Sequence, residues 1–111
     1  MAATDRRSGQ ERRSVKRFKV AVDVDWENIS GRRTGTLGDI SPLGCFVMGS
    51  GELNDGETVK IFLPAGDGMR IEFVGRVSNH VYEIGFALRF INLSDAQKIF
   101  LNDFVASHLV S

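Results

Sequence analysis

The stretch from Phe18 to Glu27 alternates between two kinds of side chain. Phe18, Val20, Val22, Val24 and Trp26 fall on one side, and Lys19, Ala21, Asp23, Asp25 and Glu27 fall on the other. A period of two is typical of a β-strand with one buried face and one face in water. A strand of roughly nine residues or more is long for a sheet in a small domain, so the pattern favours a barrel.

Shorter β-favouring runs follow, with turn residues between them and no helix. We predict strands over residues 34–40, 45–48, 58–63, 69–78 and 82–91, with turns over 30–33, 64–68 and 79–80. Gly35 and Gly38 predict a bulge or a close backbone contact in the second strand. The Asp67-Gly68 pair is typical of a hairpin. Strands in this order predict a mainly β fold, either an antiparallel barrel or a sandwich.

The end of the chain has a helical signature. Ser94 followed by Gln97 forms a capping box, and Asp95 suits the first turn of a helix. Apolar residues then recur at helical spacing: Ala96, Ile99, Phe100, Leu101, Phe104, Val105 and Leu109. We predict a structural helix over residues 95–108 that plugs or flanks the barrel.

Composition restricts the function classes that are open to this chain. Its 111 residues are 42% apolar and 25% charged, which is ordinary for one soluble globular domain. A single cysteine, Cys45, excludes an internal disulfide and fits a reducing cytoplasm. His80 and His108 are isolated from any nucleophile or second histidine, so we predict no enzyme, metal or cofactor. Because no apolar run is long enough to cross a membrane and none follows the basic start, we predict neither membrane insertion nor a secretory signal.

The charges are unevenly distributed. Formal net charge is zero, but residues 1–17 carry six basic and two acidic residues, which leaves +4 there and −4 in the remainder. The basic start favours an anionic partner, whereas the neutral total disfavours a nucleic-acid polymer. We predict a flexible basic arm over residues 1–10. A single domain over residues 11–111 would follow, with its helix at about 94–109.

The segment Asp39-Ile-Ser41-Pro-Leu-Gly44 lies between two β-favouring runs and predicts a turn. Asp39 and Ser41 can cap nearby backbone N–H groups. Pro42 suits the first corner of a turn. Gly44 permits a positive φ or the close approach of another group to the backbone.

Two of the arginines that precede the first strand are spaced as a pair. Arg13 and Arg17 are four residues apart, and guanidinium groups bind phosphates, guanine edges and flat rings. The two segments Arg13-Ser-Val-Lys-Arg17 and 39–44 together resemble the motif of PilZ domains, R-x-x-x-R followed by [D/N]-x-S-x-x-G. Both halves match without departure, and the resemblance extends from Glu11 to Leu109.

The resemblance to PilZ domains implies a six-stranded antiparallel β-barrel with a C-terminal α-helix. It also implies a receptor for the bacterial second messenger cyclic di-GMP. The ligand-binding residues it implies are Arg12, Arg13, Arg17, Asp39, Ser41 and Gly44. The arginines would contact phosphates and guanines, Asp39 would accept a hydrogen bond from a guanine, and Gly44 would let the ligand lie against the backbone.

Stoichiometry and output also follow from the resemblance. In similar proteins the residue before the first motif arginine decides how many ligands are held, and Arg12 at this place implies two molecules of cyclic di-GMP per chain. The arm would fold over the ligand and present a changed surface to a separate partner protein, in control of motility, chemotaxis or exopolysaccharide and biofilm formation.

Two other functions remain open. One is a ligand-independent PilZ-like adaptor, against which the complete motif counts. The other is a barrel that binds single-stranded nucleic acid through its basic start, which requires exposed aromatic residues for stacking. Most aromatic residues of this chain fall on predicted inward positions, so the sequence disfavours this second alternative.

Overall fold

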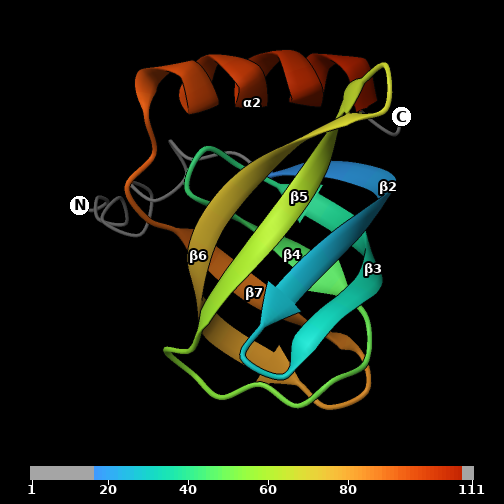
Figure 1. Ribbon diagram of the computed structural model, residues 1–111, viewed down its shortest axis with the longest axis vertical. Helices are drawn as coiled ribbons and strands as arrows, with labels where there is room; N and C mark the ends of the chain where they lie inside the picture. Colours follow the sequence, from blue (N-terminus) through green and yellow to red (C-terminus); the bar gives the residue numbers. More distant parts are fainter. Residues whose placement is uncertain (1–16, 109–111) are drawn as a thin grey trace, which may run out of the picture.

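The computed structural model describes residues 17–108. It contains six strands and one helix: β2 (Phe18–Asn28), β3 (Gly31–Ile40), β4 (Gly44–Met48), β5 (Thr58–Gly66), β6 (Met69–Val81), β7 (Gly85–Phe90) and α2 (Asp95–His108). All strand pairs are antiparallel, and the order β2-β3-β4-β7-β6-β5 is closed by pairing between β5 and β2. The chain is therefore a barrel rather than a sandwich, with α2 lying across one end (Figure 1).

The predicted alternation along β2 builds one wall of the core. Val20, Val24 and Trp26 point inward and are buried, whereas Lys19 and Asp23 are exposed on the outer face. The Trp26 indole is completely buried and meets the Phe86 ring edge to face, with 4.8 Å between the ring centroids. Burying each such apolar side chain contributes about 1.5–3 kcal/mol, so the barrel interior supplies most of the driving force for folding.

A bulge in β3 decides which way Asp39 faces. Leu37 pairs with Val47 on β4, but the next pair is Asp39 with Phe46, so Gly38 is an extra residue. Side chains along a regular strand alternate, and without the bulge Leu37 and Asp39 would share the inner face. Because of it, Leu37 and Ile40 are both fully buried, while the side chain of Asp39 keeps 30% of its exposure.

Gly35, in the same strand, allows a close contact, as predicted. A Cβ atom on Gly35 would stand 2.9 Å from the Met48 carbonyl oxygen and 3.3 Å from the Trp26 indole nitrogen. Only hydrogen fits there, so Gly35 makes the space that the buried indole occupies.

Three of the predicted turns were misplaced. The first turn is at residues 29–30 rather than 30–33, so β3 starts at Gly31 instead of Thr34. The turn predicted over 64–68 is shorter, because β5 continues through residues 64–66 to a tight turn at Asp67-Gly68. The predicted turn at Asn79-His80 is wrong, because β6 runs to Val81 and the chain turns at 82–84. Consequently β7 begins at Gly85 rather than residue 82. Backbone pairing with β7 overrides the polar composition of residues 78–80, with a bulge absorbing one residue.

Helix α2 begins and ends where the sequence predicts. Ser94 and Gln97 exchange the two hydrogen bonds of a capping box: the Ser94 amide donates to Gln97 Oε1 (2.8 Å) and the Gln97 amide donates to Ser94 Oγ (3.1 Å). Leu101 and Phe104 are buried against the barrel, and the Phe100 ring lies 5.9 Å from that of Phe73. The buried face is narrower than predicted, because Ile99 is 64% exposed.

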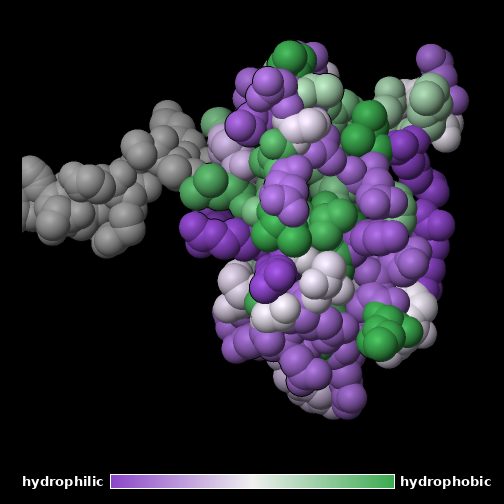
Figure 2. All heavy atoms as spheres, turned by 60° about the vertical axis from the view of Figure 1, so that its left-hand side comes forward, coloured by the Kyte–Doolittle hydropathy of each residue, from purple (hydrophilic) through white to green (hydrophobic). Residues whose placement is uncertain are grey.

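The outer surface carries both polar residues and exposed hydrophobic ones. On the face drawn in Figure 2, hydrophobic residues form small groups surrounded by hydrophilic ones. Between residues 17 and 108 no helix has the length and apolar character needed to cross a membrane.

Candidate ligand site

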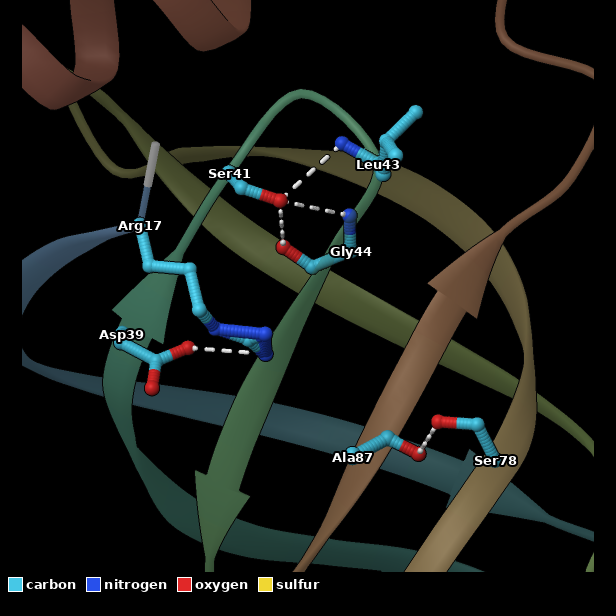
Figure 3. A network of polar contacts seen from close by, with 7 residues as sticks. All are labelled: Arg17, Asp39, Ser41, Leu43, Gly44, Ser78 and Ala87. Atoms are coloured by element: carbon cyan, nitrogen blue, oxygen red, sulfur yellow. Dashed lines mark hydrogen bonds and ion pairs between the residues drawn. The ribbon is translucent and has the colours of Figure 1, made fainter. Parts of the chain in front are cut away.

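The turn between β3 and β4 is built around one buried hydroxyl. Ser41 Oγ accepts hydrogen bonds from the amides of Leu43 (3.1 Å) and Gly44 (3.2 Å), and the Ser41 amide donates to the Gly44 carbonyl (2.8 Å) (Figure 3). The Leu43 carbonyl accepts a hydrogen bond from Phe90 on β7 (2.8 Å). The Ser41 side chain therefore holds the turn in shape, which is the local role that the sequence predicts.

Gly44 is held in the tightest backbone contact of this turn. Its strand partner is Arg89 on β7, and a Cβ atom added to it would overlap the Leu88 carbonyl oxygen. The close approach predicted for Gly44 is thus made by a neighbouring strand.

Replacing Gly44 with alanine is expected to destabilise the fold by about 1–3 kcal/mol or more, because β4 and β7 must move apart. Gly38→Ala is the matched control, since its added methyl meets only the flexible end of Met48 (3.2 Å). Denaturant unfolding of both variants measures the difference. Equal midpoints for Gly44→Ala and wild type would show that the strands yield without cost.

An ion pair lies beside the turn. Arg17 extends from the start of β2 toward β4, and its NH2 group lies 3.4 Å from Asp39 Oδ1 (Figure 3). The two side chains are 52% and 30% exposed, so the pair is accessible to solvent and contributes little stability. Asp39 Oδ1 accepts no hydrogen bond from residues 17–108. This oxygen is itself buried, so the exposed surface of the pair belongs to the Arg17 guanidinium and to the rest of the Asp39 side chain.

The charges of Arg17 and Asp39 also affect the buried thiol of Cys45. Burial raises the pKa of Cys45 far above its ordinary value, the negative charge of Asp39 raises it further, and Arg17 partly opposes both. Cys45 is therefore a neutral, apolar filler of the core.

A cavity of about 240 Å³ opens on the outer face of the barrel next to this ion pair. It is lined by Arg17, Ser41, Leu43, Gly44, Ser78, Ala87, Leu88 and Arg89. The structure thus brings three of the predicted site residues, Arg17, Ser41 and Gly44, to one cavity. Asp39 does not line the cavity, but it forms an ion pair with Arg17, which does. Arg12 and Arg13 lie outside the described residues.

Sequence reasoning missed two polar residues of this cavity. Ser78 lies on β6 and its hydroxyl donates a long hydrogen bond to the Ala87 carbonyl (3.5 Å), which leaves it able to reorient (Figure 3). Arg89 lies on β7, directly opposite Gly44. The signal for Arg89 was present in the sequence: it is a charged residue at an outward position between the inward Leu88 and Phe90.

The electrostatics of this cavity differ from those of another one on the barrel. A cavity of about 350 Å³ over β2 and β3 is lined by Asp23, Asp25 and Arg70, among others, and its arginine is already bonded to Asp25 at 2.8 Å. The cavity at the turn has two arginines, and Asp39 is the carboxylate beside it. Of the two, the cavity at the turn is the one that suits an anionic ligand with flat rings.

Solved structures with the same fold include PilZ domains. The PilZ domain of CeSA from a cellulose-synthesizing bacterium is similar with a TM-score of 0.66 and 21% identity, over 83% of this chain and 96% of that chain. The PilZ domain of YcgR from Escherichia coli with c-di-GMP has a TM-score of 0.73 and 16% identity, over 87% of this chain and 91% of that chain. PlzA from Borreliella burgdorferi in complex with c-di-GMP has a TM-score of 0.69 and 12% sequence identity. This match covers 91% of this chain and 44% of that chain. Identities this low support the fold alone.

Sequence comparison gives a more direct result. The family model for the PilZ domain matches residues 11–107, which is nearly the whole chain. A comparison with curated protein sequences gave no match.

Proposed function

Because this chain belongs to the PilZ domain family, we propose that it is a receptor for cyclic di-GMP and has no catalytic activity of its own. The observation that carries the proposal is the solvent-accessible pair of Arg17 and Asp39 beside the turn at Ser41, with Arg17 and the turn lining one cavity. Related PilZ domains have been solved with c-di-GMP, which supports the same ligand here.

The proposed contacts follow from the chemistry of each group. Arg17 and Arg13 bind phosphate and guanine through bidentate hydrogen bonds. Asp39 accepts from the N1 and N2 edge of a guanine through its carboxylate, since the side chain is 30% exposed. Ser41 and Gly44 are both engaged in the turn itself, so we propose that they act by shaping the cavity wall and by presenting backbone to the ligand.

Binding of the ligand would change the surface around Arg17 and pass a signal to a separate partner protein. Titration with cyclic di-GMP and, in parallel, with a single-stranded oligonucleotide tests the receptor function. Saturable binding of cyclic di-GMP alone is the expected result. Binding of neither would favour the ligand-independent adaptor, and binding of the oligonucleotide alone would favour the nucleic-acid alternative. Binding of the oligonucleotide alone is disfavoured, since Trp26, Phe73 and Phe86 are fully buried and cannot stack on bases.

We expect the wild-type chain to bind two molecules of cyclic di-GMP and Arg12→Leu to bind one. A guanidinium is flat and carries several donors, so it can stack on the guanine of a second molecule and contact its phosphate, whereas leucine fills the same space. Calorimetric titration counts the ligands. A wild-type chain that saturates at one ligand would contradict the role of Arg12 and leave the receptor function standing.

A further inference from the structure

Exposed apolar side chains gather at the end of the barrel that lies away from α2 (Figure 1). Within residues 17–108, eight large hydrophobic side chains are exposed. Four of them belong to the end of β4 and to the β6–β7 connection: Met48, Val81, Tyr82 and Ile84. Tyr82 is 73% exposed and Ile84 is 56% exposed. Single exposed apolar residues are ordinary, whereas several together mark an interaction surface.

Strand pairing makes these residues neighbours. Met48 on β4 and Val81 on β6 are the two strand partners of Gly85 on β7. Gly85 has no side chain, and the ring of Phe46 lies beside it: a Cβ atom on Gly85 would stand 3.0 Å from Phe46 Cε2. Together these side chains form one surface, which we call the apolar patch: Phe46, Met48, Val81, Tyr82 and Ile84.

The turn that carries Tyr82 and Ile84 is held by two backbone hydrogen bonds. The Ile84 amide donates to the Val81 carbonyl (2.9 Å), and the Gly49 amide donates to the Ile84 carbonyl (3.1 Å). The second bond ties the turn to the residue that follows β4. The apolar side chains are therefore presented on a fixed backbone, which lowers the entropy lost when a partner binds.

The charges of the patch indicate the chemistry of what it binds. Residues 40–51 and 77–88 contain no Lys or Arg and a single carboxylate, the exposed Glu83. Aromatic residues and methionine with few charges are typical of the core of a protein interface. A second copy of this chain, packed about a two-fold axis here, would bring only acidic charge to the contact. A different protein with an apolar face and a Lys or Arg opposite Glu83 is complementary instead.

The patch is continuous with the ligand cavity. Phe46 is the strand partner of Ala87 on one side and of Asp39 on the other. Ala87 lines the cavity, and Asp39 pairs with Arg17, which lines it as well. A protein seated on the patch therefore reaches the edge of the cavity and the ligand held there.

We propose that the apolar patch is the docking surface for a separate partner protein, which has an apolar face with a basic residue opposite Glu83 and also contacts the bound ligand. The proposal rests on the receptor function proposed above and assigns its output to one face of the barrel. A stable interface takes about 20–30 residues from each partner, and the patch offers few. The ligand supplies part of the remaining contact, so the partner binds tightly only to the loaded receptor.

The test begins by identifying the partner in native cells. The photoreactive residue p-benzoylphenylalanine replaces Tyr82 in one variant and Ile99, an exposed residue of α2, in the control. Illumination is expected to join position 82, and not position 99, to one other protein. No adduct at position 82, an adduct of two copies of this chain, or the same adduct at both positions would overturn the proposal.

Binding of the purified partner then tests each part of the surface. We expect cyclic di-GMP to strengthen wild-type binding by about tenfold or more. Ile84→Ser and Glu83→Lys should each weaken it by a similar factor, as expected of residues near the centre of an interface. Glu83→Gln should cost less than Glu83→Lys, because it removes the attraction without adding repulsion. Ile99→Ser is the matched control and should bind as wild type does.

Parallel titration with cyclic di-GMP separates this proposal from the receptor function. The patch residues do not line the cavity, so Ile84→Ser and Glu83→Lys should keep wild-type affinity for cyclic di-GMP and a wild-type melting temperature. A wild-type chain that does not bind cyclic di-GMP would overturn the receptor function itself. Equal partner affinity with and without the ligand, or wild-type partner affinity in both variants, would overturn the docking surface while the receptor function stands.

Discussion

Phe104→Ala is expected to lower the free energy of unfolding by about 3–5 kcal/mol, the range for removing a fully buried phenylalanine. Phe104 is only 3% exposed, and its ring lies 5.7 Å from that of Phe100 and 4.2 Å from the imidazole of His108. Phe100 in turn contacts Phe73 in the barrel. Truncation therefore leaves a cavity in the contact between α2 and the barrel, which neighbouring side chains fill only in part.

The matched control lies on the same helix. Ile99 is 64% exposed, so Ile99→Ala should change the unfolding free energy by no more than about 0.5 kcal/mol. Denaturant unfolding of both variants provides the comparison. If Phe104→Ala unfolds at the wild-type denaturant midpoint, the helix does not stabilise the barrel, and its apolar face is a surface for a partner protein.

The helix also bears on the ligand site, because it packs close to the motif turn. An apolar cavity of about 280 Å³ is lined by Phe18, Ser41, Pro42, Leu101, Asn102, Val105 and Ala106. Phe18 follows Arg17 directly, and Ser41 organises the turn. The start of β2, the motif turn and α2 therefore meet at one cavity.

The sequence predicted the elements of this fold better than their ends. The alternation from Phe18 and the capping box at Ser94 are local patterns with one structural solution each, and both were confirmed. The turn expected at Asn79-His80 was wrong because those residues are polar for a different reason. They lie on the outer side of a long barrel strand, and pairing with β7 decides their conformation.

The candidate site was predictable to the extent that it is contiguous in sequence. The turn at 39–44 was recognised because Asp39, Ser41 and Gly44 are close together in the chain. That Asp39 faces outward depends on the bulge at Gly38, for which the sequence offered two glycines and no means of choosing between bulge and close contact. Arg89 and Ser78 could not be assigned to the site from the sequence, because they lie on strands that are distant from the motif in the chain. The order of strands in the closed barrel brings them to the same cavity.

Arg17→Ala is expected to weaken cyclic di-GMP binding by about ten- to a hundredfold or more, with folding intact. A bidentate, charge-assisted contact contributes on the order of 1.5–3 kcal/mol, which corresponds to that change in affinity. Arg13→Ala should have an effect of the same size, since Arg13 is the other arginine of the first motif half. The ion pair that Arg17 makes with Asp39 is half exposed, so its loss should change stability by no more than about 1 kcal/mol.

Arg70 provides a close match for this experiment. It is 55% exposed and pairs with Asp25 at 2.8 Å, much as Arg17 is 52% exposed and pairs with Asp39 at 3.4 Å. Arg70→Ala removes the same charge and the same kind of ion pair on a different part of the barrel. Calorimetric titration should therefore show wild-type affinity for Arg70→Ala and weakened binding for Arg17→Ala. Equal affinity of Arg13→Ala, Arg17→Ala and wild type, with all of them folded, would place the ligand elsewhere and remove the basis for the receptor function.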